Sequence, residues 1–145
     1  RMLLESYAAR RGVSLLSDAD IGQLEQYVQQ SMRSHDRQDF KTVIESNTRF
    51  HEMLNSCCDN RLLRRALENN HHLSLLARAQ EFACYKRDPS YLQEHMAVVD
   101  ALKLRDPQLV ESRMREHIAN DRRFYLECSH PAGDPVGTAP QTAGL

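Results

Sequence analysis

The feature that most constrains this chain is the scarcity of helix-breaking residues in its first 128 positions. Only 5 glycines and 5 prolines occur among the 145 residues, and three of the prolines lie at positions 131, 135 and 140. Glycine and proline are the residues that most strongly interrupt regular structure. Their scarcity predicts long helices with short connections, and no segment shows the alternation of apolar and polar residues that is typical of a strand.

Apolar residues spaced three and four positions apart predict six helices. The expected segments are residues 1–11, 17–34, 40–57, 61–85, 88–104 and 106–128. In the fourth segment, a run of apolar residues is expected to face the core: Leu62, Leu63, Ala66, Leu67, Leu73, Leu76 and Ala77. The predicted fold is therefore an all-α antiparallel bundle of about six helices without a sheet, covering residues 1–128. Residues 129–145 lack periodicity and are predicted to form a disordered tail.

The charge and the cysteine content narrow the functional classes. A formal net charge of -1 at pH 7 gives no attraction to a phosphate backbone, so this segment is not expected to bind nucleic acid by itself. The four cysteines show no CxxC pairing, and no signal peptide is visible, so free thiols in a reducing cytoplasm are expected. No apolar run reaches the length of a membrane span. A cytoplasmic protein without a membrane partner is therefore predicted.

Four polar residues lie on apolar helix faces, and their chemical types suggest a metal site. Asn47 and His51 are four residues apart, so they share the apolar side of the third predicted helix. His95 and His117 lie near the middle of the fifth and sixth helices, also on apolar stripes. Three imidazoles and one amide oxygen that meet inside a bundle would suit a first-row divalent cation.

The same residues are compatible with two further functions. A single histidine on an apolar face is more often a hydrogen-bonded core residue than a ligand, so the chain could be a metal-free helical dimerisation module. It could also be a metal-dependent enzyme, for which Asp121, one turn after His117, is the only carboxylate on the right face. The remaining acidic neighbours adjoin a histidine in sequence and are expected to point elsewhere on their helices: Glu52, Glu94 and Glu116.

The order and spacing of several short motifs resemble one known family. The motifs are Arg1-x-x-x-Glu5, Asn47-x-x-Phe50-His51, Asp59-Asn60-x-Leu62-Leu63, Glu94-His95 followed by Asp100-Ala101-Leu102, Arg105-Asp106-Pro107 and Met114-x-x-His117. Together they resemble the FCD effector-binding domain of GntR-family bacterial transcription regulators, from residue 1 to about residue 126. The gaps of 44 residues from His51 to His95 and of 22 residues from His95 to His117 fit the same family.

The resemblance implies a metal-dependent sensor of small acids. The family's metal ligands, usually an aspartate but sometimes an asparagine together with three histidines, would here hold Zn or Ni: Asn47, His51, His95 and His117. The resemblance further implies a small carboxylate effector on the metal, with Arg1 as a partner of its acid groups. A neutral Asn47 leaves more positive charge at the metal than an aspartate would, and so attracts an anion more strongly.

The resemblance also describes a larger protein than the printed chain. Members of this family form homodimers and carry an N-terminal winged helix-turn-helix domain that binds DNA. That domain is absent from this sequence and is expected in the full protein. The implied mechanism is allosteric, because the effector bound in the helical bundle would change operator binding by the missing domain.

Overall fold

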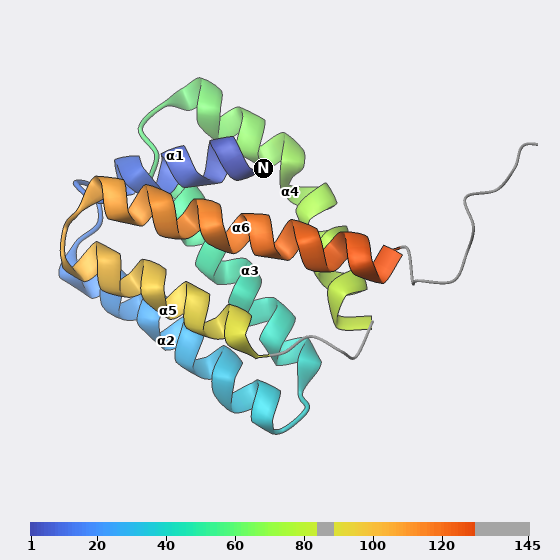
Figure 1. Ribbon diagram of the computed structural model, residues 1–145. Helices are drawn as coiled ribbons and strands as arrows, with labels where there is room; N and C mark the ends of the chain where they lie inside the picture. Colours follow the sequence, from blue (N-terminus) through green and yellow to red (C-terminus); the bar gives the residue numbers. More distant parts are fainter. Residues whose placement is uncertain (84–88, 130–145) are drawn as a thin grey trace, which may run out of the picture.

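The computed structural model describes residues 1–83 and 89–129, apart from the side chains of residues 71–72, 77–83 and 129. The described residues form six α-helices and no strand (Figure 1). The helices are α1 (Met2–Gly12), α2 (Asp18–Asp36), α3 (Phe40–Ser56), α4 (Arg61–Ala83), α5 (Ser90–Lys103) and α6 (Pro107–Ser129). The predicted all-α bundle is confirmed, whereas the predicted tail falls on residues 130–145, outside the described part of the chain.

One apolar core holds most of the bundle together. Helices α1, α2, α3, α5 and α6 pack around it, and α4 contacts α1, α3 and α6 from outside this group (Figure 1). The core side chains are large and almost completely buried, among them Leu24, Phe50, Leu54, Leu102 and Met114. Burial of such side chains stabilises the fold by about 1.5–3 kcal/mol each. The histidines expected to face inward therefore lie in a rigid, tightly packed environment.

Short-range hydrogen bonds determine where two of the helices begin. The Ser17 hydroxyl accepts a hydrogen bond from the Asp20 N–H at 3.2 Å, and the Asp20 carboxylate accepts one from the Ser17 N–H at 2.9 Å. This capping box starts α2. The Asp106 carboxylate accepts hydrogen bonds from the N–H groups of Gln108 and Leu109, both at 3.0 Å, and so caps α6.

Two helices end with a non-glycine residue in the left-handed conformation, Gln38 (φ 59°) after α2 and Arg105 (φ 55°) after α5. The N–H of the residue after each donates to the carbonyl five positions earlier, at 2.9 Å and 3.4 Å respectively. This is the Schellman arrangement, in which glycine is usual because a Cβ is disfavoured at positive φ. The Arg105 guanidinium offsets this cost, since it donates to the carbonyls of Val13 and Leu16 at 2.9 Å and 2.6 Å.

Gln38 is exposed, and its replacement by glycine is expected to stabilise the fold. Glycine adopts the left-handed conformation without the clash of a Cβ, so Gln38→Gly should be about 0.5–1 kcal/mol more stable than the matched Gln38→Ala variant, which keeps the Cβ. Urea unfolding followed by circular dichroism measures the free energy of unfolding of both variants. Equal stability of the two would show that residue 38 carries no such backbone cost.

The position of α4 differs from the prediction. Three leucines that were expected to face the core are exposed by 76%, 66% and 67%, namely Leu62, Leu73 and Leu76. Leu67, also expected inward, is buried as predicted, and the same side of α4 continues with Asn70 and Ser74. Because α4 packs against the outside of the other helices, only a narrow side of it is covered. The side chain of Ala77, also expected inward, lies outside the described part of the structure.

The remaining sequence-based expectations concern thiols and membranes. Cys57, Cys58 and Cys128 are thiols rather than disulfides, as predicted, and Cys84 lies outside the described residues. Burial raises the pKa of the Cys57 thiol, and its Sγ donates to the Met53 carbonyl at 3.1 Å. Within residues 1–83 and 89–129, no helix combines the length and the apolar character needed to cross a membrane.

Candidate metal centre

Three histidines from three helices meet in the interior of the bundle. His51 of α3, His95 of α5 and His117 of α6 are exposed by 2%, 2% and 1%. One ring nitrogen of each lies within 4.8 Å of the corresponding nitrogens of the other two, and the Nε2 atoms of His51 and His95 are 3.2 Å apart. The ring centroids of His95 and His117 are 4.1 Å apart. The structure thus brings the three predicted histidines together, while their role as ligands stays a prediction.

Carboxylates behind two of the rings orient the imidazoles. Glu5 of α1 lies with its Oε2 2.8 Å from His51 Nδ1, and Glu94 of α5 lies with its Oε2 2.9 Å from His117 Nδ1. When Nδ1 carries the proton of a neutral imidazole and donates it to a carboxylate, Nε2 keeps its lone pair. This pairing is the usual support of a metal-bound histidine. It therefore favours the Nε2 atoms as the atoms that face a cation.

Sequence reasoning assigned neither carboxylate to this role. Glu94 was expected to point away from the histidines because it adjoins His95 on the same helix. Its side chain instead contacts His117 on the neighbouring helix α6 and also accepts a hydrogen bond from Asn120 at 2.7 Å. Glu5 is 4% exposed, and its burial in the first turns of α1 follows from the packing of α1 over α3.

Two buried polar atoms indicate that the cluster fits a cation. Asn47 Oδ1 and His117 Nε2 are buried, and neither has a hydrogen-bond partner among the residues that the structure describes. A buried acceptor without a partner costs about 1–3 kcal/mol. Divalent metals bind amide oxygens and imidazole nitrogens, and both atoms belong to residues that the sequence predicts as ligands. Each is an atom that a divalent ion could satisfy, so the chemistry of the residues present fits such an ion.

The Arg1 side chain forms ion pairs with two carboxylates near the histidine cluster. Its Nε is 2.8 Å from Glu5 Oε1, and its Nη2 is 3.0 Å from Asp121 Oδ2. Asp121 Oδ2 is in turn 3.4 Å from His117 Nε2. Arg1 was predicted to pair with an acid group of an effector, and this role stays a prediction. In the structure the guanidinium is 19% exposed and already bridges two carboxylates.

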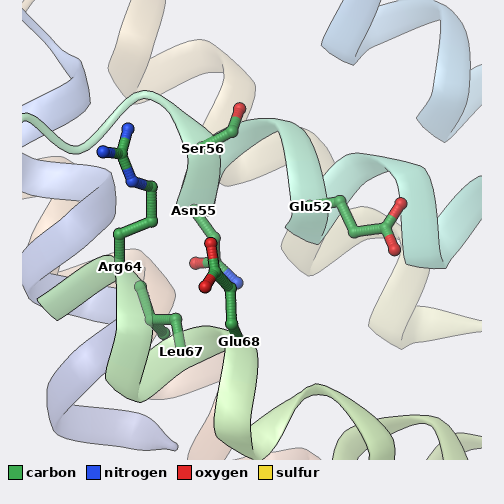
Figure 2. A pocket seen from close by; sticks show the side chains of 6 residues that line it. All are labelled: Glu52, Asn55, Ser56, Arg64, Leu67 and Glu68. Carbon is green, nitrogen blue, oxygen red and sulfur yellow. The ribbon is translucent and has the colours of Figure 1, made fainter. Parts of the chain in front are cut away.

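A small cavity lies beside His51, under α4. Its volume is about 20 Å³, and it is lined by Arg1, Glu5, His51, Glu52, Asn55, Leu67, Asn70 and Ser74. A wider pocket of about 290 Å³ adjoins it between α3 and α4 (Figure 2). The two share Glu52, Asn55 and Leu67, so the wider pocket leads toward the cavity beside His51. Sequence reasoning missed Asn70 and Ser74, which give the cavity its polar wall.

Comparison with known proteins identifies the family of this chain. Residues 1–120 match the family model of the FCD domain. The HTH-type transcriptional repressor RspR of Escherichia coli strain K12 is 27% identical over 118 residues, which cover 81% of this chain and 52% of RspR. The uncharacterised HTH-type transcriptional regulator YdfH of Shigella flexneri is similar to the same extent. The chain spans about half the length of these curated relatives, and it belongs to the FCD domain family, which confirms the resemblance found in its sequence.

Proposed function

We propose that this chain is the effector-sensing domain of a cytoplasmic transcription regulator that holds a divalent metal, with Zn or Ni expected. The ligands would be the four residues marked in the sequence: Asn47, His51, His95 and His117. The observation that carries the proposal is the buried cluster of three imidazoles, two of them oriented by carboxylates. It is supported by Asn47 Oδ1 and His117 Nε2, which are buried without hydrogen-bond partners among the described residues. When bound, the metal would supply open coordination positions to an acid group.

The proposed effector is a small organic acid. A cation held by neutral imidazoles and a neutral amide attracts anions, and the guanidinium of Arg1 lies beside the cavity that reaches His51. A cavity of about 20 Å³ holds one water molecule and no larger ligand. Effector binding therefore requires α4 to move away from α3, which is a conformational change that a regulator can transmit.

The proposed output is a change in DNA binding by a domain outside this chain. Both relatives named above are HTH-type transcriptional regulators, one of them a repressor, and they are about twice as long as the matched segment. By analogy, the full protein would be a homodimer with an N-terminal winged helix-turn-helix domain on each subunit. The effector can regulate only if it binds the DNA-bound and DNA-free arrangements with different affinity.

A thermal-shift screen of small mono- and dicarboxylates tests the effector class. A matching acid at about 100 times its Kd adds about 2.7 kcal/mol to the stability of the folded state. This corresponds to an increase in Tm of about 5–10 °C for a domain of this size. The increase should appear only in metal-loaded protein, and the uncharged amide of the same acid is the matched control. If no acid raises Tm in metal-loaded protein, the carboxylate assignment is wrong, although the metal site is not affected.

A further inference from the structure

The cavity beside His51 has a polar wall on α4, on the side of that helix that is covered by the bundle. Asn70 and Ser74, one turn apart, form this wall, and Ser74 is 8% exposed. Buried polar groups cost free energy unless they are hydrogen-bonded. The hydrogen bonds that these two side chains already make therefore show what they can still offer to a molecule in the cavity.

The hydrogen-bond donors of the wall are largely used within α4 itself. The Ser74 hydroxyl donates to the Asn70 carbonyl at 3.1 Å, and the Asn70 side-chain amide donates to the Ala66 carbonyl at 2.8 Å. A hydroxyl has a single proton, so Ser74 offers the cavity only the lone pairs of its oxygen. Asn70 keeps one N–H and the two lone pairs of its Oδ1. The wall therefore offers the cavity more acceptors than donors.

The charged side chains toward the wider pocket add further acceptors. Glu52 lines both the cavity and the wider pocket, and Glu68 lines the wider pocket together with Arg64 (Figure 2). Carboxylate oxygens accept hydrogen bonds and repel other carboxylates. Arg1 and His51 line the cavity and are not among the lining residues of the wider pocket. An acid group bound beside Arg1 and His51 would thus be followed by a region rich in acceptors.

We propose that the effector carries a hydrogen-bond donor, a hydroxyl or an ammonium group, on the carbon next to its carboxylate, and that Ser74 and Asn70 recognise this donor. The proposal rests on the acid-sensing function proposed above and narrows it to 2-hydroxy and 2-amino acids. Arg1, His51 and Ser74 line one cavity of about 20 Å³, so they lie close enough to bind neighbouring groups of one small molecule. A donor satisfies the acceptors of the wall, whereas a second carboxylate would face their lone pairs.

The test measures the affinity of Zn²⁺-loaded protein for matched acids by isothermal titration calorimetry. Each set has one carbon skeleton in three forms, the unsubstituted acid, the 2-hydroxy acid and the 2-amino acid, as in propanoate, lactate and alanine. For a skeleton that binds, the better of the two donor forms should bind about 10–100-fold more tightly than the unsubstituted acid, because the latter leaves buried acceptors unpaired. A dicarboxylate of the same length should bind no more tightly than the unsubstituted acid.

Variants of the wall decide the origin of this preference, because a hydroxyl that bound the metal would favour the same acids. Ser74→Ala should lower the ratio of the two Kd values more than threefold, and adding Asn70→Ala should remove most of the preference that remains. The Kd of the unsubstituted acid should change less than threefold. Alanine favours a helix, so α4 is expected to persist. If the double variant does not fold, Ser74→Ala alone decides by the same criterion.

Another buried serine provides the matched control. Ser6 of α1 is 0% exposed, its hydroxyl donates at 2.6 Å to the Met2 carbonyl four positions earlier, and it lines neither the cavity nor the wider pocket. Ser6→Ala removes the same kind of hydrogen bond and should keep the full preference for the donor forms. A double variant of the wall whose Kd ratio stays within threefold of the parent value would overturn the proposal.

The failure of this inference is distinct from failure of the proposed function. If the parent binds unsubstituted acids as tightly as their hydroxy and amino forms, the protein is an acid sensor whose wall recognises no donor, and the inference is wrong. If the metal-loaded parent binds no acid in any of the three forms, the acid-sensing function fails and the inference fails with it.

Discussion

Replacing His95 by alanine is expected to abolish metal binding while the helices remain. His95 contacts both of the other rings, with its Nε2 3.2 Å from that of His51 and its ring centroid 4.1 Å from that of His117. Loss of a direct ligand should lower the metal affinity more than 100-fold, because loss of a partner behind a ligand already costs 10–100-fold. Elemental analysis after dialysis should find less than about 0.1 metal ion per chain, against about one in the parent.

A second histidine provides the matched control. His35 of α2 is half-buried and packs against Phe40 and Tyr91, outside the cluster of three. His35→Ala should keep a full complement of metal, and circular dichroism should show helical content close to that of the parent for both variants. A His95→Ala protein that still carries one metal ion per chain would exclude His95 from the site.

Metal should also stabilise the folded state strongly and in a pH-dependent way. An ion that binds only the folded chain, at about 1,000 times its Kd, adds about 4.1 kcal/mol to the free energy of unfolding. The Tm should therefore rise by about 8–16 °C when Zn²⁺ replaces a chelator at pH 7.5. Ligation requires neutral imidazoles, and the pKa of a free histidine is about 6.5. Protons compete with the metal below this value, so the increase in Tm should shrink steeply between about pH 6.5 and pH 5.

Differential scanning fluorimetry with Zn²⁺ or with chelator, at several pH values, measures this dependence. The chelator series reports how the metal-free protein itself responds to pH, so the difference between the two series isolates the metal. His95→Ala should show no difference at any pH. A parent protein with the same Tm in Zn²⁺ and in chelator at pH 7.5 would be incompatible with an ion held by the cluster.

The limits of the helices were predictable where neighbouring residues determine them. Ser17 and Asp20, which are three positions apart, form a capping box, and Asp106 caps the helix that starts directly after it. Such interactions depend on the local sequence alone. The two left-handed helix ends at Gln38 and Arg105 were missed, because neither residue is a glycine that would mark the position.

The meeting of the three histidines was predictable for a different reason. His51, His95 and His117 lie near the middle of their helices on apolar stripes, and packed helices of similar length bring their middles close together. The carboxylates that bind the Nδ1 atoms of two of these histidines were not predictable. Glu5 is 46 residues from His51, and Glu94 is 23 residues from His117. Such pairs depend on the rotation of one helix against another, which no local pattern describes.

The orientation of α4 was predicted wrongly because its leucines are spread over several sides of the helix. The prediction placed all of them inward, but Leu62, Leu73 and Leu76 are exposed, whereas Leu67 is buried as expected. The covered side turns polar after Leu67, at Asn70 and Ser74, because it closes the cavity beside His51. Polar residues here line a cavity in place of the usual apolar contacts, and such a position is where reasoning from hydrophobic pattern is expected to fail.

The bridge from Arg1 to Glu5 and Asp121 has a mechanical consequence. Farther along the same helix, Ala8 and Ala9 are fully buried, so that part of α1 is fixed against its neighbours. An acid that draws the guanidinium away from Asp121 would therefore release the first turn of α1 while Ala8 and Ala9 act as a pivot. A small rotation about the pivot is magnified toward the first turn of the helix, so the loss of one ion pair would tilt that turn.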